Sequence, residues 1–138
     1  MVPQQIVVGY SWKDYIAALL EKGHASKAAI HSCGEGKLWA GCLAFDISRE
    51  EVLEIVDGFS DSSILRQYGI NINGKRYTLT RISEGKIMVG RDVFNGSGCV
   101  IYKCNTCVII CVHDENMSLG GCYSVVERIG DFLCNKSF

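Results

Sequence analysis

Hydrophobic residues recur at helical spacing over residues 11–20, close to the start of the chain. At about 100° per residue, the larger apolar side chains fall within roughly 140° of one another, which predicts one buried stripe on an amphipathic helix. Those side chains are Trp12, Tyr15, Ile16, Leu19 and Leu20. Ser11 is a favourable N-cap residue, and Gly23 is well placed as the residue that ends the helix. We therefore predict a helix that begins after Ser11 and stops before Gly23.

A second strongly amphipathic stretch runs from about residue 118 to residue 134. Its apolar face is centred on Cys122, Val126, Ile129 and Leu133. Between these two helices, Ser48-Arg49-Glu50-Glu51 has the form of a capping box, which predicts a helix that starts there. Residues 60–68 are expected to form a short helix or a turn.

Short runs of β-forming residues, separated by turn residues, fill the middle of the chain. Asn73-Gly74 is a typical hairpin turn, and Gly34-Glu35-Gly36 has two residues that can take a positive φ. The predicted strands are residues 27–33, 37–43, 70–71, 77–82, 86–89, 99–104 and 107–113. Strands that follow one another through short turns pair antiparallel. The sequence therefore predicts an α+β fold, with a central antiparallel sheet and the two terminal helices packed on one face.

Composition and charge exclude several classes of protein. The 138 residues are 48% apolar and 21% charged, which is ordinary for a globular domain and untypical of disorder. A net charge of −1 gives no strong field that would favour DNA, RNA or an anionic membrane as the main partner. No apolar run approaches the ~18 residues of a membrane-spanning helix, so no transmembrane segment is expected.

Eight cysteines raise the questions of disulfides, metal ligation and catalysis. Residues 1–10 lack the features of a signal peptide, so we expect a cytosolic protein with reduced thiols. Cys99, Cys104, Cys107 and Cys111 have spacing similar to iron–sulfur ligands, but they alternate with strong β-formers where a cluster needs an irregular loop. We expect no metal and no cofactor. A Cys104–Cys107 disulfide under oxidation stays open as an alternative.

Nucleophilic catalysis is not favoured either. His31 and Cys33 share a strand face, and His113 precedes Asp114, but no candidate nucleophile lies at a strained turn or at a helix N-terminus. The glycines form no phosphate-binding loop. We therefore expect a protein that is not an enzyme.

The aromatic residues suggest a binding surface instead. If both terminal helices pack on one sheet face, their ends bring five rings within reach of one another: Trp12, Tyr15, Trp39, Phe132 and Phe138. We expect Trp12 and Trp39 to face solvent, which would leave more aromatic surface uncovered than is usual for a monomer.

At this point the chain resembles the profilin family. The resemblance is carried by Ser11-Trp12 with Tyr15, by residues 34–40 (Gly-Glu-Gly-Lys-Leu-Trp-Ala), by residues 73–77 (Asn-Gly-Lys-Arg-Tyr), and by residues 114–118 and 125–133. It covers residues 11–138, which we expect to be one profilin-like domain. It implies that the two shorter helices lie on the sheet face opposite the terminal helices.

The resemblance also implies a function and its residues. Profilins bind monomeric actin, regulate its polymerisation, bind proline-rich segments and bind phosphoinositides, as cytoplasmic proteins associated with the cytoskeleton. Residue by residue, the polyproline-binding groove would be Trp12, Tyr15, Trp39, Phe132 and Phe138. The actin-binding residues would include Arg76, Arg81, Arg91, Gly121, Ser124 and Arg128. Phe132 stands where the family often has a tyrosine, so one hydroxyl is missing.

Two departures from the family pattern change these expectations. Gly90-Arg91-Asp92-Val93 stands where many members have a glycine-flanked pair of lysines, so Asp92 weakens the case for tight actin and phosphoinositide binding. Residues 1–10 form an N-terminal extension that is a disordered leader, a remnant of expression or an added edge strand. If it folds across Trp12, it could obstruct the groove.

Two other classes remain as alternatives. One is an α+β sensory or scaffold module, of the roadblock-like or PAS-like kind, which would not need solvent-facing tryptophans. The other is a cysteine redox protein, which would need at least one thiol of low pKa.

Overall fold

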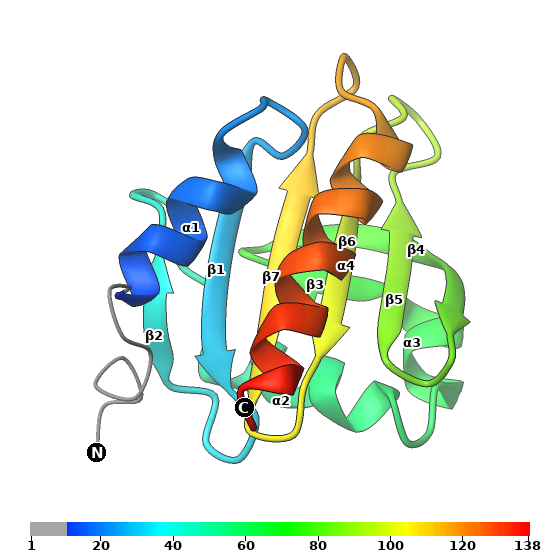
Figure 1. Ribbon diagram of the computed structural model, residues 1–138. Helices are drawn as coiled ribbons and strands as arrows, with labels where there is room; N and C mark the ends of the chain where they lie inside the picture. The colour runs from blue at the N-terminus through cyan, green and yellow to red at the C-terminus, as the bar shows by residue number, and fades with distance from the viewer. Residues whose placement is uncertain (1–10) are drawn as a thin grey trace.

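Seven strands form one antiparallel sheet in the computed structural model, which describes residues 11–138 (Figure 1). In chain order they are β1 (Lys27–Ser32), β2 (Leu38–Gly41), β3 (Ile70–Ile72), β4 (Lys75–Ser83), β5 (Ile87–Arg91), β6 (Gly98–Lys103) and β7 (Cys107–His113). Across the sheet the order is β2-β1-β7-β6-β5-β4-β3. The hairpins β1–β2, β3–β4, β4–β5, β5–β6 and β6–β7 pair neighbours in the chain, and β1 joins β7 to complete the sheet.

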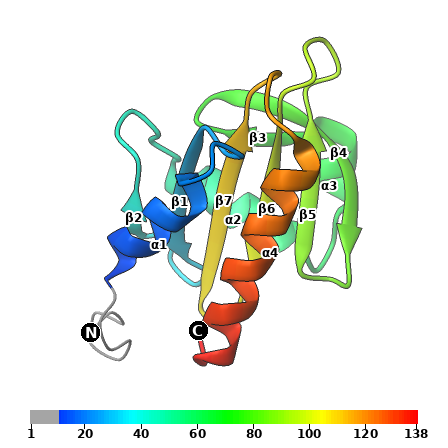
Figure 2. The ribbon, with the colours of Figure 1, turned by 45° about the horizontal axis from the view of Figure 1, so that its top comes forward.

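The helices cover both faces of this sheet. On one face lie α1 (Trp12–Leu20), which contacts β1 and β2, and α4 (Leu119–Asn135), which contacts β6 and β7. On the other face lie α2 (Arg49–Gly58) and α3 (Ser63–Tyr68). Figures 1 and 2 show the terminal helices side by side in front of the sheet, with the short helices behind it. The predicted α+β fold is confirmed, including the placement of its helices.

Two hydrophobic cores result, one on each side of the sheet. The first joins the inner faces of α1 and α4 to alternate residues of β1, β6 and β7, and the second joins α2 and α3 to the intervening residues. All seven residues of β7 are buried because this central strand is covered on both faces. That double burial explains why its sequence is a nearly continuous apolar run instead of an alternating one.

The helix termini follow the local sequence. The hydroxyl of Ser48 accepts the backbone N–H of Glu51 at 3.1 Å, and the carboxylate of Glu51 accepts the backbone N–H of Ser48 at 3.0 Å, so the predicted capping box is present. The Asp14 carboxylate accepts the backbone N–H of Ser11 at 2.8 Å. Gly23 has a φ of +72°, the left-handed conformation expected just beyond a helix.

Two contacts with Tyr102 of β6 set the rotation of α4 on the sheet. A Cβ placed on Gly130 would lie 2.3 Å from the ring of Tyr102 in β6, so only glycine lets the helix lie against that ring. Beside it, the Tyr102 hydroxyl donates to Asp131 Oδ1 at 2.5 Å. These two contacts determine which side chains of α4 point outward and toward α1.

The cysteines lie mostly inside the two cores. All eight are free; Cys99, Cys104, Cys107, Cys111 and Cys122 are buried, and Cys33, Cys42 and Cys134 are half-buried. Within residues 11–138, no group of three or more His, Cys, Asp or Glu side chains is placed to hold a metal ion. Across the same residues, no helix has the length and apolar character needed to cross a membrane.

Candidate functional site

The five predicted groove residues lie together at the ends of α1 and α4. The Trp12 ring lies 5.5 Å from that of Tyr15, 4.9 Å from that of Trp39 and 5.1 Å from that of Phe138, measured between centroids. The Tyr15 ring lies 6.0 Å from that of Phe132. These separations and the tilted ring planes are those of favourable aromatic pairs. The structure therefore gathers the predicted residues into one aromatic cluster, defined here as these five side chains.

The exposure of this cluster differs from the prediction. Trp12 is only 3% exposed and Tyr15 only 4%, whereas Trp39 is half-buried and Phe132 is 38% exposed. The prediction that Trp12 faces solvent is therefore wrong. Its ring packs against those of Tyr15, Trp39 and Phe138, contacts that a residue's place on a helix does not reveal.

The C-terminal residue is fixed within the cluster. The main-chain oxygen of Phe138 accepts hydrogen bonds from both the backbone N–H and the hydroxyl of Thr106, in the turn between β6 and β7. The Phe138 ring is buried against Trp12. This anchor brings the end of the chain back to the start of α1, across the sheet face that carries both terminal helices.

A shallow pocket of about 230 Å³ opens beside the cluster. It is lined by Tyr15, Arg128, Ile129 and Phe132, so both the α1 and the α4 sides of the cluster reach it. Trp12 offers a hydrogen-bond donor nearby, because its indole Nε1 is buried and has no acceptor within the described part of the chain. Trp12 itself does not line the pocket, and an unpaired buried N–H is costly.

The predicted actin-binding residues fall into two groups. Arg76 and Arg81 on β4 and Arg91 on β5 are exposed on the side of the β4–β5 hairpin. The Arg81 guanidinium lies 5.2 Å from the centre of the Tyr123 ring of α4, a cation–π distance. Of these three side chains, Arg81 contacts α4, whereas Arg76 lines a pocket with residues of α3.

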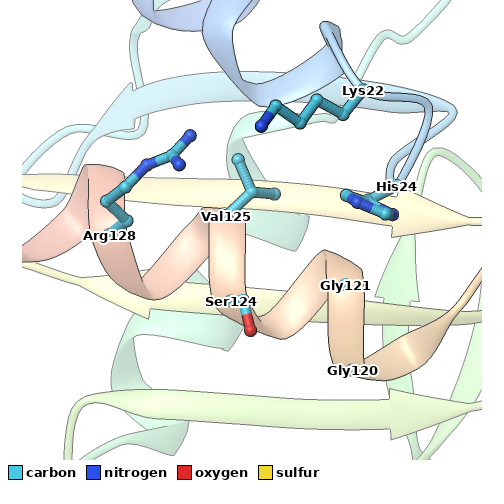
Figure 3. Close-up of a pocket in the computed structure, with 7 residues that line it drawn as sticks. All are labelled: Lys22, His24, Gly120, Gly121, Ser124, Val125 and Arg128. Carbon is cyan, nitrogen blue, oxygen red and sulfur yellow. The ribbon is translucent and has the colours of Figure 1, made fainter.

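The other group faces α1. Gly121, Ser124 and Arg128 line a pocket of about 450 Å³ together with Lys22, His24, Gly120 and Val125 (Figure 3). A Cβ on Gly121 would lie 2.4 Å from His24 Nδ1, so the His24 ring lies directly over this glycine. Arg128 also lines the pocket beside Tyr15 and Phe132, which places it between the two surfaces instead of within one.

Asp92 has a structural partner. Its Oδ2 lies 3.5 Å from Lys75 Nζ, and its Oδ1 accepts the backbone N–H of Phe94 at 2.9 Å. The hydrogen bond from Phe94, together with Lys75, holds the pKa of Asp92 below its usual range. The negative charge that departs from the family pattern is therefore paired with Lys75 at the surface, beside Arg91.

Sequence reasoning missed several residues of these surfaces. Lys22 and His24 complete the larger pocket, Ile129 completes the smaller one, and Tyr123 stacks with Arg81. Only the topology could have indicated Lys22 and His24. When the first and last helices share a sheet face, the loop after the first helix must pass near the start of the last helix. No motif marks it.

A sheet of this order, with both terminal helices on one face, defines an α+β protein of the profilin class. The family model for profilin matches residues 10–138, and the chain belongs to the profilin family. A profilin of Bombyx mori is 33% identical over 124 residues, which cover 89% of this chain and 95% of that protein. The family is non-enzymatic.

Solved profilins share the fold. Acanthamoeba castellanii profilin II is 26% identical and superimposes with a TM-score of 0.85, covering 93% of this chain and 100% of that one. Mouse profilin IIa, solved in complex with a double repeat from the FH1 domain of mDia1, is 18% identical with a TM-score of 0.80, over 94% and 100% of the two chains. The similarity to the mouse protein shows the fold.

Proposed function

We propose that this protein binds monomeric actin and regulates its polymerisation, and that it binds proline-rich segments of partner proteins at a second surface. The observation that carries the proposal is the aromatic cluster of Trp12, Tyr15, Trp39, Phe132 and Phe138, assembled from both ends of the chain. Membership of the profilin family supports both activities in general. The complex of mouse profilin IIa with an FH1 repeat supports a proline-rich partner.

The chemistry of the cluster fits a proline-rich ligand. Polyproline II segments are extended before they bind, so they lose little conformational freedom, and they present apolar rings beside unpaired carbonyl groups. Trp39 and Phe132 offer partly exposed ring faces, whereas the Trp12 Nε1–H is buried and has no acceptor within residues 11–138. We propose that prolines stack on these exposed faces.

The actin surface is proposed on the β4–β5 side of α4. Arg81 on β4 and Arg91 on β5 are exposed there, and Arg76 lies farther along β4, in a pocket beside α3. Arginines are well suited to desolvated ion pairs with carboxylates. Gly121, Ser124 and Arg128 extend this surface across the start of α4 toward the pocket with Lys22 and His24. We propose only weak phosphoinositide binding, because the Asp92–Lys75 pair removes one free positive charge from this edge.

The proposal is tested by separating the two activities. Arg81→Glu should weaken inhibition of actin polymerisation, because like charges would face an acidic partner, and should leave oligoproline binding intact. Phe132→Ala should do the reverse, with a loss of about 2 kcal/mol, or roughly thirtyfold in affinity. Both side chains are exposed enough for the fold to survive, which circular dichroism can verify. If neither variant changes either activity, the scaffold alternative becomes the better one.

Trp12→Ala is a less suitable test than Phe132→Ala. A tryptophan that is 3% exposed contributes to the core, and its truncation is expected to cost about 3–5 kcal/mol of unfolding free energy. Removing residues 1–10, which lie outside the described residues, tests whether that segment obstructs the groove. Oligoproline binding should stay the same or increase, and a decrease would assign those residues to the groove.

A further inference from the structure

The most exposed aromatic ring of the described residues lies far from the aromatic cluster. Phe94, in the loop between β5 and β6, is 95% exposed, and its neighbour Val93 is 59% exposed. Single exposed apolar residues are common on protein surfaces and need no explanation. Two adjacent ones at the end of a hairpin form a defined apolar surface when the loop that carries them is held in one conformation.

Hydrogen bonds within the loop hold it in this way. Asp92 accepts the Phe94 backbone N–H through its carboxylate and the Gly96 N–H at 3.0 Å through its carbonyl, and its own N–H donates to the Ser97 carbonyl at 2.7 Å. Asn95 Oδ1 accepts both the backbone N–H and the hydroxyl of Ser97, at 2.9 and 2.8 Å. Gly96 supplies the positive φ of +81° that closes the turn. We call residues 92–97 the anchor loop.

A contact from β4 braces the anchor loop from outside. Lys75 Nζ lies 3.5 Å from the Asp92 carboxylate and 2.9 Å from the Ser97 hydroxyl. The only ionised groups of the loop and its brace therefore neutralise each other below the tip. What the loop presents to solvent is a fixed, uncharged pair of apolar side chains. A partner that binds it does not have to order the loop, so less conformational entropy is lost on binding.

The position of the anchor loop indicates which partner it meets. Arg91, the last residue of β5 and part of the proposed actin surface, directly precedes the loop, and Arg91 pairs with Thr78 of β4. Figures 1 and 2 show the loop beside the connection from β7 to α4, at the end of the sheet where α4 begins. The loop thus continues the proposed actin surface beyond its basic residues.

We infer that Val93 and Phe94 form an apolar anchor that inserts into a hydrophobic pocket of monomeric actin, with Phe94 the dominant contact. This inference rests on the proposed actin binding and adds a residue to which no role has been given. Central aromatic anchors commonly dominate an interface, whereas charged residues around them contribute mainly to rate and orientation. An apolar anchor in this position would also compensate for the absence of the family's pair of lysines there.

Phe94→Ala is the direct test, and Leu43→Ala is its matched control. Leu43 is 93% exposed but follows β2, at the opposite edge of the sheet. Affinity for monomeric actin is measured by titration of a fluorescent actin, alongside thermal unfolding and oligoproline binding. Phe94→Ala should weaken actin binding by at least ~tenfold, Phe94→Leu should retain most of it, and Leu43→Ala should bind like the parent. None of these should change the melting temperature or oligoproline binding.

The outcomes separate this inference from the proposed function. If the parent protein does not bind actin, both fall together. If the parent binds actin and Phe94→Ala binds equally well, the anchor is wrong and the function stands. The anchor is also wrong if Phe94→Ala abolishes concentration-dependent dimerisation or flotation with phosphatidylcholine–phosphatidylserine vesicles while leaving actin affinity unchanged. In that case the tip contacts a second copy of the chain or a bilayer.

Discussion

Among single residues, His31 carries the clearest cost of burial. Its side chain lies in β1 and is buried, with Nδ1 3.1 Å from the carbonyl oxygen of Gly36, so Nδ1 carries the proton and donates it. Its Nε2 has no partner within residues 11–138. Burial lowers the pKa of His31 below its ordinary value, and the hydrogen bond to Gly36 only partly opposes this. The folded protein therefore holds this imidazole neutral where the unfolded chain would protonate it.

The consequence is a dependence of stability on pH. Since the unfolded chain binds a proton near pH ~6.5 and the folded chain does not, the free energy of unfolding falls as the pH drops from ~7.5 to ~5.5. His31→Gln should be less stable at the higher pH but lose less stability over this interval than the parent. Urea unfolding followed by tryptophan fluorescence measures both values. An equal or steeper loss in the variant would show that His31 does not titrate in this way.

The members of the aromatic cluster could be predicted from the sequence, but the exposure of each ring could not. Trp12, Tyr15, Trp39, Phe132 and Phe138 come together because they lie at ends of elements that share one sheet face. How far each ring is covered depends on side-chain packing between those elements. Trp12 illustrates this, since its 3% exposure reflects neighbours from β2 and from the C-terminus. Periodicity places a residue on a face and says nothing about what lies over it.

Among the elements, α4 positions more of the proposed sites than any other. Arg128 and Phe132 point from it toward α1, Tyr123 stacks with Arg81 on the other flank, and Gly130 holds it against Tyr102. Any change in its rotation would move both proposed binding surfaces at once. The glycines of this helix should therefore differ in how much they contribute to stability.

Gly130→Ala and Gly120→Ala form a matched pair that tests this. At Gly130 the new methyl group would overlap the Tyr102 ring at 2.3 Å, and such overpacking typically costs about 1–3 kcal/mol or more. At Gly120 the nearest atom would be the Ser118 hydroxyl at 3.6 Å, so the gain in helix propensity of up to ~1 kcal/mol should remain. Chemical denaturation should thus show a loss for Gly130→Ala and no loss for Gly120→Ala. Equal effects at both sites would mean that α4 can shift away from the sheet.

The elements themselves were largely predictable from local signals. All four helices and all seven strands lie within a few residues of their predicted positions, because caps, turn glycines and periodicity act within short stretches of chain. The flank of α4 on which a given arginine lies was not predictable. Arg81 and Arg128 are both predicted actin-binding residues; the first lies beside Tyr123, and the second lines a pocket with Tyr15. That separation follows from the rotation of the helix on the sheet, which long-range contacts determine.

For the molecule as a whole, the burial of the cysteine thiols shows how well the two hydrophobic cores exclude solvent. Four of the buried cysteines lie in the core under α1 and α4, and Cys99 lies in the core under α2 and α3. Burial raises the pKa of both Cys99 and Cys122 to about 12, so few thiolates form at neutral pH. The half-buried Cys33 and Cys134 also have pKa values raised to about 11. A cysteine redox protein would need the opposite, a reactive thiol of low pKa.

We therefore predict two kinetic classes when the native, reduced protein reacts with a chromogenic disulfide reagent. Cys33, Cys42 and Cys134 should react slowly but measurably, since reagent can reach them. The five buried thiols should react only as fast as the cores open, because neither reagent nor water reaches them in the folded state. All eight should react at once in concentrated guanidinium chloride, and the intact mass before reaction should equal that of the fully reduced chain without metal. Three results would contradict the structural role of these cysteines and favour the redox alternative. They are an intact mass lower by the two hydrogens lost when one disulfide forms, stoichiometric zinc or iron, and a single thiol that reacts faster than free cysteine.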